Sequence, residues 1–334
     1  MGKEKNVLII GVGGVGGYFG GLMANGIEVN NNKSFKIHFI ARGEHLKQIE
    51  QNGLILNTNK KKGIICKPST ISSEIKNIKA PDIIILSVKS FDLPHVLDEI
   101  SDIVEENTVI LPLMNGIDIY ERIRNKIQKG IVLPTSVYVT SEIEQPGTVC
   151  QKWNDGHLTI GADPKYNGYY PNFLLELLEK SGITYEWSEN SYPDIWEKYM
   201  LVASYSLVTA AFNVKIGDVF ADFNLEEITR QVIIEIYNLG QAKGIDLHEC
   251  TINDSLYRGR KFPNDTKTFY QRDIETKGKL NESDIYGGTL IQIANELQIE
   301  IPIIKELHQS ILESVNNNNV SNIYNKLTEY AYHS

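Results

Sequence analysis

The chain contains little cysteine and no long apolar run. Its three cysteines, Cys66, Cys150 and Cys250, are widely spaced and odd in number, so neither a disulfide framework nor a paired-cysteine metal site is supported. We therefore expect no bound metal and a reduced, cytoplasmic location. No segment reaches the roughly eighteen consecutive apolar residues of a membrane helix. The first apolar run begins at Val7, which leaves no room for a signal peptide, so we expect no association with membranes.

Positive charge is also scarce. Lysine and arginine total 33 against 42 acidic residues, which gives a net charge of −9 and a pI near 5.4. Nucleic acid as the main partner would require a basic face that this composition does not suggest. We expect a small-molecule partner, and a local basic pocket could still bind an anionic cofactor. With 334 residues, 42% of them hydrophobic, the chain is long enough for two domains with separate cores.

A glycine-rich turn is the most informative segment. It follows the apolar run 7–10 and precedes a stretch of small and apolar residues typical of a buried helix. In a βαβ nucleotide site the first glycine makes the tight turn, the second lets backbone approach a diphosphate, and the third lets helix and strand pack closely. The helix N-terminus then binds the anion. A glycine-rich surface loop is the alternative, but it does not account for the preceding strand. The predicted cofactor-binding residues are Gly11, Val12, Gly13, Gly14, Val15 and Gly16.

The residue after the second predicted strand indicates which dinucleotide binds. The strand covers 35–41, and an NAD enzyme would place an acidic residue at its end to bind the ribose hydroxyls. This chain has Arg42 there, whose guanidinium could pair with the 2′-phosphate of NADP(H). An exposed arginine closing a strand is the alternative, and the nearby Glu44 slightly weakens the cofactor interpretation. We therefore predict NADP(H).

Two more predicted strands end in polar residues. The strand 82–88 is followed by Lys89, and the strand 108–113 is followed by Asn115-Gly116. Ligands of open α/β sheets bind beyond the carboxyl ends of the strands, so Lys89 and Asn115 are cofactor-site candidates. A solvated loop lysine and an ordinary Asn-Gly turn are the alternatives. Later strands at 131–134 and 136–140 are expected to continue the sheet.

The pattern changes near 188–193, where strands give way to long helices. Helices are expected at 195–212, 224–243, 284–297 and 303–314, with a short last helix after 319. The predicted fold is α/β, with a Rossmann-type parallel sheet followed by an all-helical C-terminal domain. We assign 1–190 to NADP binding and 191–334 to substrate binding and catalysis.

One lysine stands out in the first C-terminal helix. From Trp196 to Phe212 the only charged residues are Glu197 and Lys198, which we place in the first turn of a helix opening at Pro193. A helix dipole disfavours a cation there, and an apolar surrounding would lower the pKa of Lys198 and make it a proton donor near neutral pH. A lysine whose ammonium reaches solvent is the alternative.

These motifs together resemble the 2-dehydropantoate 2-reductase (ketopantoate reductase) family over nearly the whole chain. The matching segments, in order, are the glycine turn, Ala41-Arg42-Gly43, Val88-Lys89, Asn115-Gly116, Ile195-Trp196-Glu197-Lys198, Gln271-Arg272-Asp273 and Asn281-Glu282 with Gly287-Gly288. The resemblance implies that NADPH delivers hydride to the C2 carbonyl of ketopantoate, which gives pantoate for pantothenate and coenzyme A synthesis.

The resemblance also implies residue roles. Lys198 would be the general acid, Glu282 the catalytic partner of the substrate hydroxyl, and Asn115 a contact of cofactor and substrate. Lys89 would lie in the cleft and Arg42 would hold the 2′-phosphate. Without the resemblance, Glu282 would be interpreted as an acidic residue in the first turn of a helix.

Three positions depart from the family pattern. Val202 and Ser206 occupy places where well-studied members have asparagine. Phe269 replaces a serine that helps to hold the substrate carboxylate, and the adjacent Thr268 could substitute for it. The candidate substrate-binding residues are Asn115, Lys198, Val202, Ser206, Thr268 and Glu282.

Three functions remain open at this point. The first is an NADPH-dependent ketopantoate reductase, and the second is a reductase of another 2-oxo acid. The third is an NADP-sensing protein without turnover, against which the presence of a proton donor argues. A homodimer is compatible with the chain, but the sequence does not specify the oligomeric state.

Overall fold

The computed structural model describes residues 4–78, 80–152, 155–166, 168–276 and 280–317, together with Tyr324 and Leu327. The chain divides into two compact units, Met1–Ser191 and Tyr192–Ser334. The short helix predicted after 319 lies outside the described residues, apart from Tyr324 and Leu327. Among the described helices, none is both long and apolar enough to cross a membrane.

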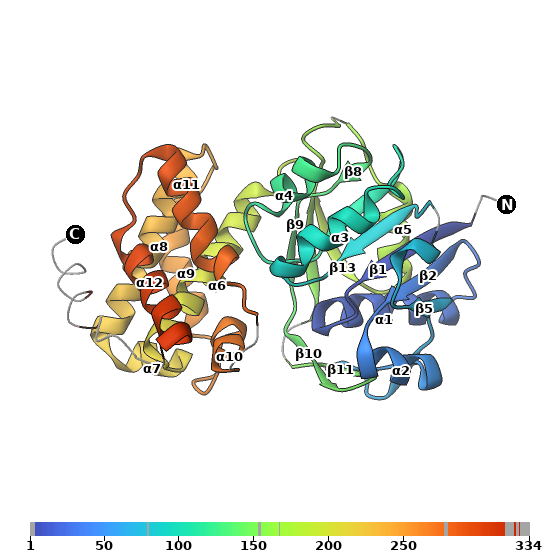
Figure 1. The fold of residues 1–334 in the computed structure, drawn as a ribbon, viewed down its shortest axis with the longest axis horizontal. Helices are drawn as coiled ribbons and strands as arrows, with labels where there is room; N and C mark the ends of the chain where they lie inside the picture. The colour runs from blue at the N-terminus through green and yellow to red at the C-terminus, as the bar shows by residue number, and fades with distance from the viewer. Residues whose placement is uncertain are drawn as a thin grey trace. The chain divides into compact units, whose positions relative to one another are not determined.

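A six-stranded parallel sheet organises the N-terminal unit (Figure 1). Its spatial order is β5-β2-β1-β6-β7-β8, and every neighbouring pair is parallel. The Rossmann-type sheet predicted from the sequence is confirmed. The strands are β1 (Lys5–Ile10), β2 (Phe35–Ile40), β5 (Thr70–Ser72), β6 (Ile83–Leu86), β7 (Val109–Pro112) and β8 (Ile131–Val132).

Alternate residues of the central strand enter two different cores. Val7 and Ile9 of β1 belong to one hydrophobic cluster, while Leu8 and Ile10 belong to the other. Side chains alternate between the two faces of a strand, so helices must cover both faces of this sheet. The first core includes residues of α1 (Gly14–Val29) and α5 (Asn172–Lys180), and the second includes residues of α3 (Leu93–Ile100) and α4 (Ile119–Lys126).

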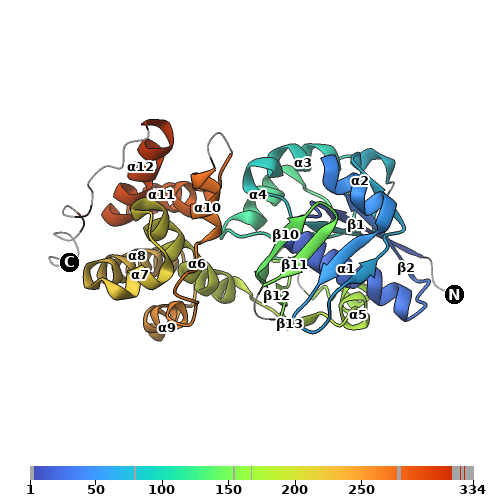
Figure 2. The ribbon, with the colours of Figure 1, turned by 90° about the horizontal axis from the view of Figure 1, so that it is seen from below.

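Two smaller sheets complete this unit, and Figure 2 shows the β10–β11 hairpin close to α1. One has the order β10-β11-β3-β4 and the other β13-β12-β9. The helix α2 (Gly43–Asn52) lies between β2 and β3 in the chain. The strands are β3 (Leu54–Asn57), β4 (Ile64–Cys66), β9 (Thr135–Tyr138), β10 (Ser141–Gln145), β11 (Thr148–Gln151), β12 (His157–Gly161) and β13 (Thr184–Ser188).

The strand expected at 136–140 does not continue the main sheet. It forms β9, which pairs antiparallel with β12 in a separate sheet. Pro134 lies between β8 and β9 and has no amide hydrogen for a ladder, while its carbonyl accepts hydrogen bonds from Gly161 N at 2.7 Å and Ser191 Oγ at 3.0 Å. These two bonds hold the chain where it changes sheets.

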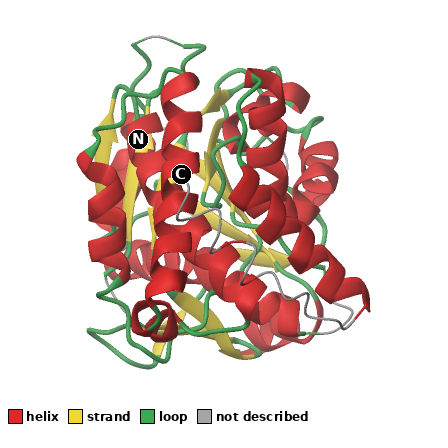
Figure 3. Ribbon diagram, turned by 90° about the vertical axis from the view of Figure 1, so that its left-hand side faces the viewer, coloured by secondary structure: helices red, strands yellow, loops and turns green. Residues whose placement is uncertain are grey.

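The described part of the C-terminal unit is helical and contains no strand, which confirms the predicted class of this region (Figure 3). A π-helix covers Asp284–Gly288. The α-helices are α6 (Tyr192–Phe212), α7 (Ile216–Ala221), α8 (Phe223–Ala242), α9 (Cys250–Gly259), α10 (Phe269–Glu275), α11 (Thr289–Leu297) and α12 (Pro302–Asn317).

Two sequence-based expectations about these helices are wrong in detail. α6 begins at Tyr192, and Lys198 lies in its second turn, not its first. The helix dipole acts mainly on charges in the first turn, so it is not what lowers the pKa of this amine. The helix expected at 284–297 is a π-helix followed by α11. The glycine pair Gly287-Gly288 lies inside the π-helix, where local propensity for a regular α-helix is low.

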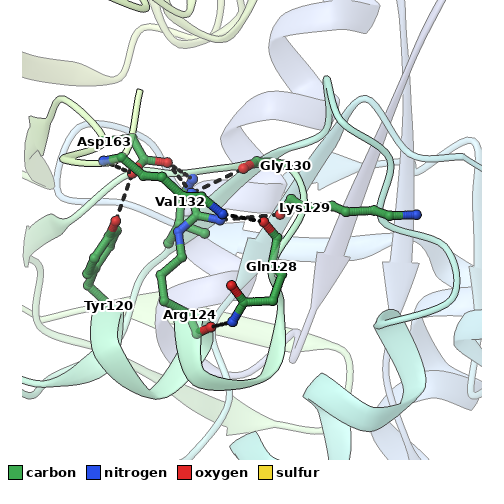
Figure 4. A network of polar contacts seen from close by, with 8 residues as sticks. Tyr120, Arg124, Gln128, Lys129, Gly130, Val132 and Asp163 are labelled. Carbon is green, nitrogen blue, oxygen red and sulfur yellow. Dashed lines mark hydrogen bonds and ion pairs between the residues drawn. The ribbon is translucent and has the colours of Figure 1, made fainter. Parts of the chain in front are cut away.

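A buried carboxylate fastens α4 to the main sheet (Figure 4). Asp163 forms an ion pair with Arg124 and accepts hydrogen bonds from Tyr120 Oη at 2.8 Å, Val132 N at 2.7 Å and Lys165 N at 2.9 Å. The side chain of Asp163 is fully buried and that of Arg124 is 10% exposed. Because the carboxylate has donors on both oxygens, its charge is compensated inside the fold.

We expect Asp163→Ala to lower the free energy of unfolding by about 3–5 kcal/mol, because it leaves the buried Arg124 charge without its carboxylate. Asp155→Ala is the control, since Asp155 pairs with Lys60 between two well-exposed side chains and should cost less than about 1 kcal/mol. Urea denaturation measures both changes. Equal losses in the two variants would contradict the assignment of Asp163 as a buried anchor.

Candidate active site

Four adjacent strands of the main sheet carry candidate residues at one edge. Because β2, β1, β6 and β7 are parallel neighbours, their carboxyl ends lie at the same edge. Arg42 follows β2, the glycine turn from Gly11 follows β1, Lys89 follows β6 and Asn115 follows β7. The structure therefore brings the predicted cofactor-site residues of the N-terminal unit to neighbouring strand ends.

The glycine turn leaves room for a ligand at one glycine and none at another. Gly11 has φ +90°, which favours glycine. A Cβ at Gly16 would lie 2.1 Å from both the Gly11 carbonyl oxygen and Ser87 Oγ, whereas a Cβ at Gly13 would meet no atom within 4 Å. Gly16 is thus required by packing, and Gly13 borders open space.

The start of α1 is suited to an anion. Its N-cap is Gly13, which has an extended backbone and supplies no side-chain cap. The first amides of a helix lack partners within the helix and carry the positive end of its dipole. With Val12 buried and Gly14 and Val15 half-buried, these amides are a candidate backbone cradle for an anionic group.

Arg42 extends into solvent at the neighbouring strand end. It is the N-cap of α2, and its side chain is 61% exposed. One guanidinium nitrogen lies 3.9 Å from Asp92 Oδ1, a distance typical of a weak surface pair. The nearby Glu44 instead accepts a hydrogen bond from Gln48 Nε2 at 2.9 Å. The guanidinium therefore remains accessible to an anionic group.

Lys89 and Asn115 are both half-buried. Lys89 is the N-cap residue of a short 3-10 helix at Ser90–Asp92. Asn115 precedes Gly116, which has φ +129° and so requires glycine at this turn. Both side chains belong to the strand-end loops at the carboxyl edge.

The C-terminal unit contains a buried amine and a buried carboxyl group. Lys198 is 9% exposed and Glu282 is 7% exposed. Burial lowers the pKa of Lys198 to about 7, far below the ordinary 10.5 of a lysine. An amine of this pKa exchanges a proton near neutral pH, which suits general acid–base catalysis.

A tyrosine joins the helix of Lys198 to the segment of Glu282. Tyr199 Oη donates a hydrogen bond to the carbonyl of Ile285, within the π-helix. The carbonyl of Glu282 accepts bonds from Ile285 N at 3.2 Å and Tyr286 N at 3.3 Å, so Glu282 opens this segment. This hydrogen bond connects α6, which contains Lys198, to the segment that begins at Glu282. The sequence analysis missed Tyr199, because a tyrosine in an apolar helix carries no sign of its distant partner.

The three positions that differ from the family pattern, Val202, Ser206 and Phe269, have different environments. Val202 is half-buried and Ser206 is buried, respectively one and two turns after Lys198 on α6. Phe269 is 38% exposed, and the guanidinium of Arg272 stacks 4.5 Å from its ring centre. Phe269 therefore presents an aromatic ring, with no hydrogen-bonding group, on the surface of α10.

The hydroxyl of Thr268 already takes part in two hydrogen bonds within the C-terminal unit. Its hydroxyl accepts a hydrogen bond from Gln271 N at 3.3 Å as the N-cap of α10, and it lies 3.0 Å from the hydroxyl of Thr209. Thr268 could donate to a carboxylate only if Thr209 supplies the hydrogen of their shared bond.

The parallel sheet with its glycine turn, followed by a helical unit with a buried lysine, defines a Rossmann-type oxidoreductase. Comparison with known families agrees: residues 7–165 match the model "Ketopantoate reductase PanE/ApbA", and residues 190–313 match "Ketopantoate reductase PanE/ApbA C terminal". The chain belongs to the ketopantoate reductase family.

Individual relatives are distant but cover most of the chain. A 2-dehydropantoate 2-reductase of Pyrococcus horikoshii is 27% identical over 89% of this chain and 93% of its own. An uncharacterised oxidoreductase of Bacillus subtilis is 24% identical over 91% of this chain and 97% of its own. The crystal structure of 2-dehydropantoate 2-reductase from Porphyromonas gingivalis has a TM-score of 0.79, at 23% identity, over 93% of this chain and 100% of its own.

The same fold also occurs in a D-mandelate dehydrogenase solved with NADH and anilino(oxo)acetate. Its TM-score is 0.79, at 19% identity, over 93% of this chain and 99% of its own. At this identity the likeness shows the fold alone.

The two glycines that differ in available space give a matched pair of variants. We expect Gly13→Ala to leave the free energy of unfolding within about 1 kcal/mol of wild type but to weaken binding of a nicotinamide dinucleotide, because the methyl group occupies the open space. Gly16→Ala should destabilise the fold by about 1–3 kcal/mol or more through overpacking. Thermal unfolding and cofactor titration measure both. A Gly13→Ala variant that binds the dinucleotide normally would contradict the assigned cradle.

Proposed function

We propose that this chain catalyses the NADPH-dependent reduction of 2-dehydropantoate (ketopantoate) to pantoate, a step of pantothenate and coenzyme A synthesis. The observation that carries the proposal is the buried amine of Lys198, whose pKa of about 7 suits proton donation to a carbonyl oxygen. The match of both parts of the chain to ketopantoate reductase models supports the substrate class.

The residues present at the carboxyl edge fit an NADP cofactor. The open space at Gly13 and the uncapped start of α1 suit the diphosphate, and the exposed Arg42 suits the 2′-phosphate. We assign the N-terminal unit to cofactor binding and the C-terminal unit to substrate binding and catalysis. When bound, NADPH supplies the hydride that the carbonyl carbon receives.

The side chains perform the rest of the reaction. Negative charge develops on the C2 oxygen as the carbon is reduced, and the Lys198 ammonium stabilises this charge and then gives its proton to the oxygen. Glu282 accepts a hydrogen bond from the hydroxyl of the substrate and so orients it. We assign Asn115 to contacts with cofactor and substrate. We assign Lys89 to stabilising the negative charge of the substrate. Lys198 regains its proton from solvent after the product leaves.

A reductase of another 2-oxo acid is the second candidate. The observation that favours it is the set Val202, Ser206 and Phe269, which would give the substrate pocket a more apolar lining than asparagine and serine would. An NADP-binding protein without turnover is the third candidate. It would have no use for a buried proton donor.

The test is NADPH oxidation by the purified protein with ketopantoate beside pyruvate, 2-oxobutyrate and 2-oxoisovalerate. A preference for ketopantoate of about two orders of magnitude in kcat/KM is expected, because a site that pairs with the substrate hydroxyl rejects analogues without it. Comparable kcat/KM values would favour the second candidate. NADPH binding without oxidation of any of the four would favour the third.

Arg42 provides a test of cofactor choice. Arg42→Asp should raise the KM for NADPH by about tenfold or more and leave the KM for NADH unchanged or lower, because the carboxylate repels the 2′-phosphate and can bind ribose hydroxyls. Steady-state kinetics with both cofactors measure the change. Equal losses with the two cofactors would show that Arg42 has a structural task instead.

Lys198 should control the pH dependence of the reaction. Because the proton donor is the ammonium, kcat/KM is expected to fall as pH rises through about 7, the pKa of Lys198. Lys198→Ala should lower turnover by about 10²-fold or more and remove this inflection. A folded Lys198→Ala variant with near-normal turnover would contradict the catalytic assignment.

The same pKa has an effect on stability whose sign can be measured separately. Between pH 7 and 10.5 the unfolded chain binds a proton at Lys198 that the folded chain does not, so the free energy of unfolding should rise with pH in this interval. Lys198→Met lacks this group, so this part of the pH dependence should be absent from its urea denaturation curves.

A further inference from the structure

His45 contacts two separate parts of the proposed cofactor site. It lies in the first turn of α2, three residues after Arg42, and its ring reaches both the glycine turn and the turn of the β10–β11 hairpin. We propose that His45 is a positioning residue that holds the glycine turn and Arg42 in one fixed arrangement, so that the diphosphate and the 2′-phosphate of the same dinucleotide are bound together. This inference rests on the proposed NADP function.

The hydrogen bonding of the ring identifies its form. The backbone amide of Gly147 donates to Nδ1 of His45 at 3.0 Å, so Nδ1 carries no proton and the hydrogen of the neutral ring is on Nε2. Burial lowers the pKa of His45, which keeps the ring in this neutral form at physiological pH. Protonation would place a second hydrogen on Nδ1 and break the bond to Gly147.

The ring also lies near the backbone of the glycine turn. Nε2 is buried and has no hydrogen-bond partner of good geometry within the described part of the chain. The carbonyl of Val12 nevertheless lies near enough to the ring to raise its pKa, in opposition to burial. The imidazole thus occupies the space between α2 and the residue that precedes Gly13.

The hairpin turn fixes the first turns of α2. Gly147 has φ +82°, and a Cβ there would lie 2.7 Å from Cβ of Gln48, so its backbone packs directly on the helix. Its carbonyl accepts a hydrogen bond from Ile55 N at 2.9 Å. Arg42 is the N-cap of this helix, and its carbonyl accepts from Leu46 N at 3.3 Å. Anchoring His45 therefore anchors the residue that presents the guanidinium.

The same hairpin also packs on the helix of the glycine turn. A Cβ at Gly14 would lie 2.2 Å from the carbonyl oxygen of Ser141, and one at Gly17 would lie 2.6 Å from Cγ2 of Val149. The hairpin is consequently in close contact with the start of α1 and with α2. His45 bonds the hairpin turn from α2 and lies near the glycine turn, at the edge where both phosphate groups would bind.

The test is a double-mutant cycle on dinucleotide binding. Dissociation constants for NADPH and NADH are measured by cofactor fluorescence for wild type, His45→Leu, Arg42→Ala and the double variant. His38→Leu is the control, because His38 is a buried histidine of β2 whose ring bonds Thr70 Oγ1 at 2.8 Å and Asn6 Oδ1 at 3.1 Å, away from the glycine turn. Thermal unfolding shows whether each variant remains folded.

We expect His45→Leu to weaken NADPH binding by about tenfold and NADH binding by about threefold or less, because only NADPH uses Arg42. In the Arg42→Ala background, His45→Leu should weaken NADPH binding no more than it weakens NADH binding. His38→Leu should leave the NADPH-to-NADH ratio of dissociation constants unchanged. His45→Asn, whose amide oxygen can accept from Gly147 N, should recover part of the lost NADPH affinity.

The remaining outcomes overturn the inference. If wild type prefers NADPH but His45→Leu weakens both dinucleotides equally, or its effect adds to that of Arg42→Ala, His45 does not position Arg42. The same holds if His38→Leu changes the ratio as much as His45→Leu does. If wild type itself shows no preference for NADPH, the proposed cofactor fails, and the inference fails with it.

Discussion

The close approach of α1 to the turn after β1 is the constraint on which the carboxyl edge of the main sheet depends. No side chain fits at Gly16, because the Gly11 carbonyl and Ser87 occupy the space where a Cβ would lie. Ser87 Oγ in turn donates to the carbonyls of Ile10 at 3.1 Å and Gly11 at 2.9 Å. This contact brings the helix N-terminus against the ends of β1 and β6, and the neighbouring strands then place Arg42 and Asn115 along the same edge.

A different constraint acts on Lys198 in the C-terminal unit. Its longest helix, α6, is buried over most of its length, and an amine in that environment loses the hydration that favours its charged form. Burial raises the free energy of the folded chain when the amine of Lys198 is charged. The lowered pKa of Lys198 reflects the same free-energy difference. Natural proteins retain such a group where activity requires it, which agrees with a catalytic role for Lys198.

The sequence predicted the features that arise locally and missed those that depend on distant contacts. The glycine turn, the strand before it and the arginine after β2 follow from neighbouring residues, so their places in the sheet could be anticipated. The bond between His45 and Gly147 joins residues 102 positions apart, and that between Tyr199 and Ile285 joins residues 86 apart. No periodicity records such pairs. The opening of α6 near Pro193 was anticipated, but Lys198 is the sixth residue from Pro193 and so belongs to the second turn, not the first.

The fate of the hydride tests the proposed reaction most directly. Ketopantoate is incubated with the protein and NADPH that carries deuterium at C4, in separate reactions for the two faces of the ring, and the product is analysed by mass spectrometry and NMR. The proposed reaction gives pantoate with a single deuterium on C2 from one of the two labelled cofactors. Unchanged ketopantoate and unoxidised NADPH, with the cofactor bound, would contradict it.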